Sequence, residues 1–199
     1  MDIVGRIISG IDDRGTPDNK REWQEAIRFK RVDMKDSPEI LADIDHVIDI
    51  SRGTTIAVGD AQVKTVEHVL AAIMGCEIDN IVVELTTNEP PVIDGSAKPF
   101  VDILREAGFR EQNAPKDYLV IDELVHYHND KSEVDIVAMP LDDFKMTVMI
   151  DYRNPALGSQ YTGLFSLENE FATEFAPAQP SEKVWEPTRS EPPLDANPG

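Results

Sequence analysis

The chain has 199 residues, of which 41% are hydrophobic and 29% charged, a composition typical of a globular protein of one domain or two small ones. Its formal net charge of −19 repels phosphate backbones and anionic lipid headgroups, so nucleic acid is not an expected partner. The single cysteine, Cys76, excludes an intrachain disulfide, and no apolar run suggests a signal peptide or a membrane span. We therefore expect a cytoplasmic protein.

The first half of the chain alternates strand and helix patterns. Residues 26–33 alternate apolar and polar side chains, and residues 44–50 and 81–85 are shorter strand candidates. Residues 63–74 carry apolar side chains at helical spacing, and residues 99–107 begin with a proline, as many helices do. This alternation predicts an α+β fold, a two-layer sandwich in which helices cover one face of a mixed β-sheet.

The second half of the chain is patterned differently. Residues 118–127, 133–138 and 145–151 are predicted strands, and no helix with an apolar stripe follows them. We expect this half to be a sheet without its helices. Its apolar face would then be uncovered, which predicts self-association through that face.

These differences divide the chain into three parts. We assign residues 1–115 to a first β-α-β-α domain and residues 116–176 to an incomplete second domain, mostly strands. Residues 177–199 contain six prolines and little apolar periodicity, so we expect a disordered tail. The boundary between the two domains is expected near residues 113–116.

A carboxylate and an imidazole stand side by side in the predicted helix at residues 63–74, as Glu67 and His68. A zinc hydrolase uses an imidazole as metal ligand and a nearby carboxylate to take a proton from water. Taken alone, the dipeptide favours an ordinary surface pair, because Glu-His is common by chance. The helix also lacks the second histidine, four residues away, of a metalloprotease helix.

The helical wheel shows which way His68 points. With about 100° per residue, His68 lies almost opposite the apolar stripe of the helix. Ala71 and Ala72 lie on the His68 side, where a solvated surface would usually carry longer polar groups. We infer that a second packed layer or a partner domain faces this side. The apolar stripe consists of Val66, Val69, Leu70 and Ile73.

The residues around this pair form an ordered series of motifs. They are Val63-Lys-Thr-Val-Glu-His-Val-Leu-Ala-Ala-Ile73, Ile78-Asp-Asn-Ile-Val-Val-Glu84 and Glu89-Pro-Pro-Val-Ile-Asp-Gly-Ser-Ala-Lys-Pro-Phe100. The series resembles the UDP-3-O-acyl-N-acetylglucosamine deacetylases of lipid A synthesis. Weaker matches at residues 29–33, 51–55 and 151–158 are most similar to the form fused to a 3-hydroxyacyl carrier-protein dehydratase. The resemblance covers residues 26–178, about the first half of the family's length.

The resemblance implies a site and a substrate. Glu67 matches the general base and His68 matches the zinc ligand of the family's first domain. Thr54 and Thr55 lie in a loop that matches one near the active site, so substrate contact is expected there. The implied substrate is a UDP-linked acylated N-acetylglucosamine, which loses its N-acetyl group. The implied fold is two α+β layers packed helix to helix, with the site between them.

The sequence also departs from the family. After Ala178 the expected Arg-Thr-Phe motif is absent, and no histidine occurs beyond His128 to supply the second domain's ligand and general acid. The sequence therefore leaves two hypotheses: a zinc deacetylase that is incomplete here, or a non-catalytic truncated fragment. A binding module without chemistry is a third class that no sequence feature favours.

Two further histidines lie on one predicted strand. His126 and His128 are two residues apart and therefore share a face. Such a pair can bind a metal ion, but Asn129 and Asp130 next to it favour a solvated strand end. His46, among acidic neighbours, is expected at the surface.

Overall fold

The structure is a computed structural model that describes residues 7–8, 27–112 and 118–179. The domain boundary expected near residues 113–116 and most of the expected tail lie outside the described residues. Within the described ranges, no helix is long and apolar enough to cross a membrane. The elements are β1 (Ile7–Ile8), β2 (Ile27–Arg31), β3 (Glu39–Leu41), η1 (Ile44–His46), β4 (Val47–Asp49), β5 (Thr55–Val58), β6 (Ala61–Val63), α1 (Glu67–Gly75), β7 (Ile81–Leu85), α2 (Lys98–Ala107), β8 (Val125–Asn129), β9 (Val134–Ala138), β10 (Met146–Asp151), β11 (Ser159–Leu164), α3 (Leu167–Glu170) and η2 (Phe171–Phe175).

The largest sheet has the strand order β1-β7-β2-β3. Strands β2 and β7 run parallel, with Phe29 opposite Val83, while β1 and β3 pair antiparallel at the two edges. Along β7, every second residue is buried, as expected for a strand with one covered face. The predicted mixed sheet is therefore confirmed, as is the α+β class.

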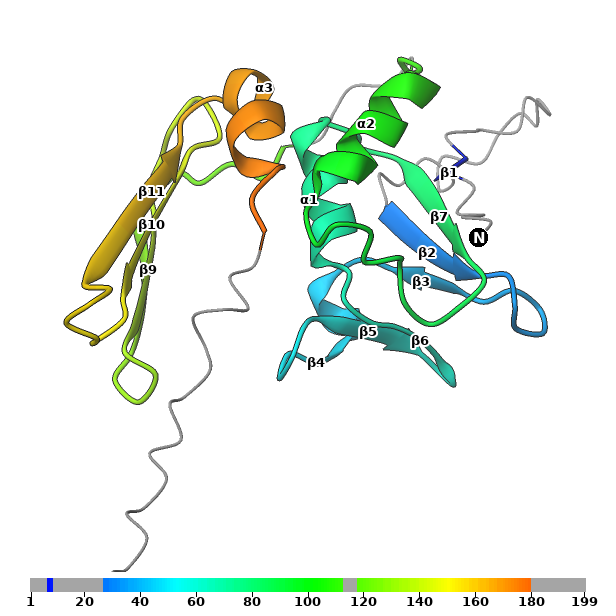
Figure 1. The fold of residues 1–199 in the computed structure, drawn as a ribbon, viewed down its shortest axis with the longest axis horizontal. Helices are drawn as coiled ribbons and strands as arrows, with labels where there is room; N and C mark the ends of the chain where they lie inside the picture. The colour runs from blue at the N-terminus through cyan, green and yellow to red at the C-terminus, as the bar shows by residue number, and fades with distance from the viewer. Residues whose placement is uncertain (1–6, 9–26, 113–117, 180–199) are drawn as a thin grey trace, which may run out of the picture.

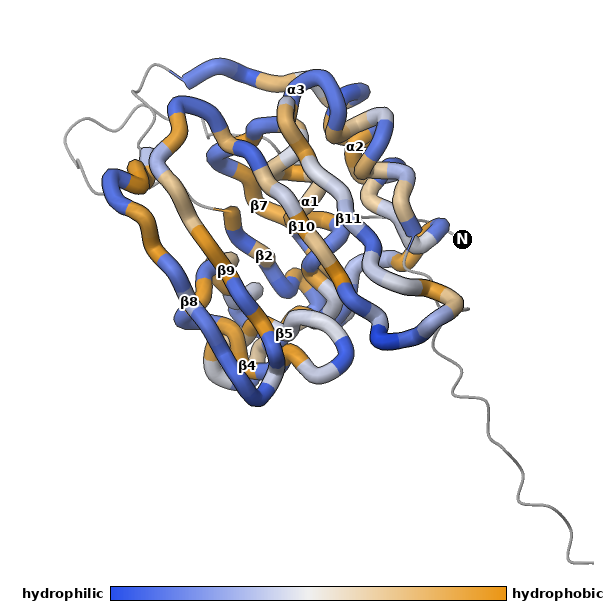
Figure 2. Tube along the Cα trace, turned by 90° about the vertical axis from the view of Figure 1, so that its left-hand side faces the viewer, coloured by the Kyte–Doolittle hydropathy of each residue, from blue (hydrophilic) through white to orange (hydrophobic). Residues whose placement is uncertain are grey.

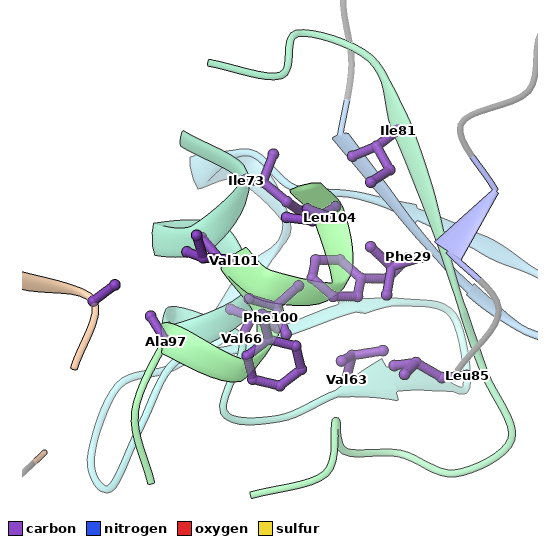
Figure 3. Close-up of a cluster of buried hydrophobic side chains, with 14 of the residues drawn as sticks. Phe29, Val63, Val66, Ile73, Ile81, Leu85, Ala97, Phe100, Val101 and Leu104 are labelled. Carbon is purple, nitrogen blue, oxygen red and sulfur yellow. The ribbon is translucent and has the colours of Figure 1, made fainter. Parts of the chain in front are cut away.

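The core lies between this sheet and two helices. Phe29 of β2 meets Ile73 of α1 and Phe100 and Leu104 of α2 in one buried cluster (Figure 3). Both helices lie on the same side of β2 and β7 (Figure 1). The apolar face of the sheet and the apolar stripes of the two helices pack against each other, so both are buried.

Helix α1 begins four residues later than its apolar spacing suggests. Residues up to Val63 belong to β6, where Val63 pairs with Ile56 of β5. The backbone then turns at Thr65, with φ of 53°, and the helix starts at Glu67. A small three-stranded sheet, β4-β5-β6, was not fully predicted because its strands are too short to show a period.

The second half forms two antiparallel hairpins, β8–β9 and β10–β11. Almost every residue of these four strands is exposed, although β8, β9 and β10 carry apolar residues at every second position, as strands with one buried face do. Figure 2 shows apolar stretches along both β9 and β10. The predicted strand at residues 118–127 is shorter in the structure and begins at Val125.

The expectation that the second half has no helices is wrong. Helix α3 and the π-helical turn η2 follow β11 and lie beside α1 (Figure 1). Phe171 packs on Gly75, where an added Cβ would be 2.0 Å from the phenyl ring. A second element thus packs against the C-terminal end of α1, where Gly75 leaves room for the ring of Phe171. The layer inferred to face His68 stays a prediction.

Candidate functional site

Glu67 opens α1, and its carboxylate joins this helix to the loop before β5. The Oε1 atom accepts a hydrogen bond from the backbone N–H of Thr54. Gly53 lies so close that an added Cβ would be 3.5 Å from the same oxygen. A carboxylate at a helix N-terminus also interacts favourably with the helix dipole. The loop therefore fixes one oxygen of Glu67, while the side chain stays exposed to solvent.

Thr65, directly before the helix, is held in an unusual conformation. Its φ of 53° is strained for a β-branched residue, at a cost of about 1–3 kcal/mol. Its hydroxyl donates to Glu89 Oε1 at 2.6 Å, and the N–H of Lys64 donates to the carbonyl of Asn88 at 2.9 Å. These bonds tie the start of α1 to the loop after β7. Sequence reasoning gave no role to Glu89, although it lies inside a matched motif.

His68 is the second residue of α1, directly after Glu67, and is half-buried. Asp94 lies in the loop between β7 and α2. The hydrogen bonds that Asp94 accepts from the hydroxyl of Ser96, at 2.8 Å, and from its N–H, at 2.9 Å, are the main causes that hold the pKa of Asp94 below its usual value. The charge of His68 also lowers this pKa. Gly95 has φ of 79°, as the tight turn requires. The turn at residues 94–96 is therefore held by its own hydrogen bonds.

The two predicted substrate-contact residues have different positions. Thr54 is half-buried and lies next to Glu67 through its backbone N–H. Thr55 is the first residue of β5 and only 7% exposed, opposite Asp49 of β4. Thr54 thus faces the end of α1 that carries Glu67 and His68, while the side chain of Thr55 contributes to the interior. Their contact with substrate stays a prediction.

The neighbourhood of Glu67 and His68 does not by itself fit a zinc ion. A catalytic zinc takes three protein ligands, and all four histidines of the chain lie in described segments. His68 is the one histidine at this end of α1. His46 is the last residue of η1 and is hydrogen-bonded to Asp43 at 2.5 Å. A complete zinc site here needs ligands beyond those that the described residues supply.

The remaining two histidines lie together on β8. His126 and His128 share a face, as their spacing predicts, and Asp135 of β9 joins them. Within the described part of the chain, these three form the one group of three or more potential metal ligands. Asp135 was missed because the sequence does not show the register of the hairpin. All three side chains are exposed, which agrees with a solvated strand end.

Known proteins resemble most of the described chain. Residues 19–180 match the model of a family described as UDP-3-O-acyl N-acetylglycosamine deacetylase. A bifunctional enzyme LpxC/FabZ of Chlorobaculum tepidum is 59% identical over 151 residues, which are 76% of this chain and 32% of that protein. A protein of the same name from Porphyromonas gingivalis is 33% identical over 152 residues. These residues are 76% of this chain and 33% of the Porphyromonas gingivalis protein.

A relative without the fusion in its name also matches. A UDP-3-O-acyl-N-acetylglucosamine deacetylase of Teredinibacter turnerae is 40% identical over 129 residues, which are 65% of this chain and 42% of that protein. The chain therefore spans about a third of the length of the bifunctional relatives and less than half of this one. The matched region includes both helices of the first half and both hairpins of the second.

Proposed function

Because the chain belongs to the UDP-3-O-acyl N-acetylglycosamine deacetylase family, we propose that it provides part of a zinc-dependent amide hydrolase of the cytoplasm. The reaction removes the N-acetyl group from a UDP-3-O-acyl-N-acetylglucosamine in lipid A synthesis. The observation that carries the proposal is the position of Glu67 and His68 at the N-terminal end of α1, which hydrogen bonds tie to the loop before β5 and to the loop after β7. The family match favours this assignment over a non-catalytic truncated fragment.

Glu67 is the proposed general base. A base must be reachable by water and held in one orientation. Glu67 is exposed, and its bond from the Thr54 N–H fixes Oε1. Its other oxygen, Oε2, makes no hydrogen bond to the residues that the structure describes, so it is free to take a proton from the water that attacks the amide carbon. Thr54 is then a positioning residue, through its backbone.

His68 is the proposed metal ligand that this part of the protein supplies. Its imidazole is half-buried at the N-terminal end of α1, directly after Glu67. Because a catalytic zinc needs three protein ligands, His68 alone cannot hold one. Zinc dependence is therefore proposed for a site completed by residues other than those described.

The exposed hairpins lead to a proposal about association. Strands β8 and β9 present an apolar face, on which Tyr127 lies opposite Ile136 and both are more than half exposed. Exposed apolar faces with free strand edges favour contact with other chains. We propose that the 199-residue chain, taken alone, associates with a second copy through this face.

A chimaeric enzyme tests the catalytic proposal. The 151-residue segment of the Chlorobaculum tepidum bifunctional enzyme that matches this chain would be replaced by this chain's own sequence, since 59% identity favours correct packing. We expect zinc-dependent release of acetate from UDP-3-O-acyl-N-acetylglucosamine. Glu67→Gln should lower kcat by at least about 100-fold, the usual scale for a lost general base. Glu77→Gln, at the other end of α1, is the matched control and should keep full activity.

Two outcomes would count against the proposal. A folded chimaera that releases no acetate in the presence of zinc would show that this segment cannot supply a deacetylase site. Full activity of the Glu67→Gln chimaera would remove Glu67 from the role of base. The separate effect of His68→Gln on zinc content, measured by elemental analysis, distinguishes a lost ligand from a lost base.

A further inference from the structure

We propose that the polar face of hairpin β8–β9 binds a divalent transition metal ion through His126, His128 and Asp135. The ligand atoms of the three side chains lie within 4.8 Å of one another. Asp135 Oδ1 is 2.9 Å from His126 Nε2 and 2.9 Å from His128 Nδ1. This site is separate from Glu67 and His68 and does not depend on the proposed deacetylase activity.

The hairpin itself brings the ligands together. His126 and His128 are two residues apart on β8, so both side chains leave the same face of the strand. His128 lies directly opposite Asp135 of β9, and Val137 lies opposite His126. Side chains in opposite positions of an antiparallel pair share a face. Regular strand geometry therefore gathers two imidazoles and one carboxylate without a strained loop.

The distances suit a metal with little rearrangement. Zinc–nitrogen and zinc–oxygen bonds of about 2.0–2.2 Å place tetrahedral ligand atoms about 3.3–3.5 Å apart. The two imidazole nitrogens are 2.9 Å from the carboxylate oxygen that they share. A separation larger by about half an ångström requires only small side-chain rotations of exposed groups. The remaining coordination positions are open to water, because the three side chains are half-exposed.

A fourth residue orients one ligand. Asp130 Oδ1 is 2.9 Å from His128 Nε2, the ring nitrogen on the far side from Asp135. A proton on Nε2, donated to Asp130, leaves the Nδ1 lone pair for the metal. Carboxylates commonly hold metal-binding histidines in this way, and their removal typically costs 10- to 100-fold in affinity. Asp130 is therefore a positioning residue of the proposed site.

The ligand set selects the class of metal. Imidazole nitrogens favour copper, zinc and nickel, while calcium and magnesium prefer sites made of oxygen atoms alone. Among first-row divalent ions the affinity for such a site is expected to be highest for Cu²⁺. The formal charge of the chain, −19, also attracts cations to its surface.

The site lies on the face of the hairpin opposite the apolar one. Val125, Tyr127 and Asn129 of β8 alternate with the two histidines and so leave the other face, where they meet Ala138, Ile136 and Val134 of β9. Covering the apolar face by another chain would therefore leave the three ligands accessible. Metal binding and self-association are thus separable.

Copper titration of the full 199-residue chain tests the proposal. We expect one equivalent of Cu²⁺ to bind, with an electron paramagnetic resonance spectrum showing coupling to two imidazole nitrogens. His126→Ala and His128→Ala should each weaken binding at least tenfold, and Asp130→Asn about 10- to 100-fold. Zn²⁺ should compete for the same site, and Ca²⁺ should not. These surface variants should keep the circular dichroism spectrum of the unmodified chain.

The matched controls are His46→Ala and His68→Ala. His46 also pairs with an aspartate but has no second imidazole beside it, and His68 belongs to the proposed catalytic pair. Both variants should bind the equivalent of Cu²⁺ as the unmodified chain does. Undiminished binding by the His126→Ala/His128→Ala double variant would overturn the proposal, as would loss of the equivalent in His68→Ala. Failure of the deacetylase test leaves these expectations unchanged.

Discussion

Strands in the two halves of the molecule have similar sequence patterns, but only those of the first half are buried. In the first half, β2 and β7 carry apolar residues at every second position, apart from Arg31, and α1 and α2 bury this side. In the second half, β8 to β10 alternate as regularly, yet not one residue of these three strands is buried. Alternation therefore tells which side of a strand is apolar, and it does not tell whether anything covers that side.

This difference separates the two sites as well. Glu67 and His68 stand on a helix whose other side is anchored in the core, so their backbone positions are fixed by packing. The group of His126, His128 and Asp135 depends on a hairpin that its own ladder and side-chain bonds hold together. Substitutions in the core should therefore disturb the first site and leave the second intact.

The largest expected effect compares equivalent aromatic residues in the two regions. Phe29→Ala empties a fully buried position between sheet and helices, and should lower the free energy of unfolding by about 3–5 kcal/mol. Tyr127→Ala, on the exposed hairpin, should change it by no more than about 0.5 kcal/mol. Urea unfolding followed by circular dichroism measures both. Equal losses would show that the hairpin contributes to the same core.

A smaller effect is expected at the contact that joins the two halves. In Gly75→Ala the new methyl group overlaps the ring of Phe171, and overpacking of this kind costs about 1–3 kcal/mol. The higher helix propensity of alanine offsets about 1 kcal/mol of this. Phe171→Leu in the Gly75→Ala background should recover part of the stability, measured by thermal unfolding. A Gly75→Ala protein more stable than the unmodified chain would show that the halves do not pack here.

The first half was largely predictable because its signals are local. The strands at residues 27–31 and 81–85 and the second helix agree with their sequence patterns within a residue or two. The start of α1 was misplaced because Val63 continues the apolar spacing of the helix while its backbone pairs with Ile56. Periodicity alone cannot distinguish these two uses of one residue.

The site was predictable only in part, for a related reason. Glu67 and His68 are adjacent in sequence, so their proximity needs no knowledge of the fold. Glu67 is bonded to Thr54, 13 residues away, and Thr65 to Glu89, 24 residues away, and only the packed structure brings these loops together. Asp135 was missed in the same way, because its place opposite His128 depends on the length of a turn.

Self-association should depend on one face of the hairpin. Ile136→Glu places a charge on the apolar face beside Tyr127, and should weaken association of the isolated chain because a carboxylate must then be buried in the contact. Val137→Glu is the matched control, since Val137 is the next residue, points to the opposite face and is about as exposed. Sedimentation velocity over a range of concentrations measures both. A purely monomeric unmodified chain, or equal effects of the two variants, would contradict the proposal.

The smallest expected effect is a pH dependence of the stability, which arises from an ion pair in the first half. Arg31, almost fully buried, donates to both carboxylate oxygens of Asp33 at 2.8 and 2.7 Å and to the carbonyl of Gln62 at 2.7 Å. The bond from Arg31 is the main cause that holds the pKa of Asp33 below the usual value of a carboxyl group. A carboxyl group with a lowered pKa in the folded state contributes stability above its unfolded pKa, and this is lost as the pH falls through the folded value.

Asp33→Asn removes that contribution. The variant should therefore be slightly less stable than the unmodified chain at pH 7, and the difference should shrink as the pH falls below about 4. Urea unfolding at pH 7, 5, 4 and 3 measures the difference, with Asp60→Asn as an exposed control outside this ion pair. A constant difference across this range would mean that the loss comes from packing of the loop after β2. A difference that shrinks with acid would show that a buried arginine of the first half uses a surface carboxylate to keep its charge paired.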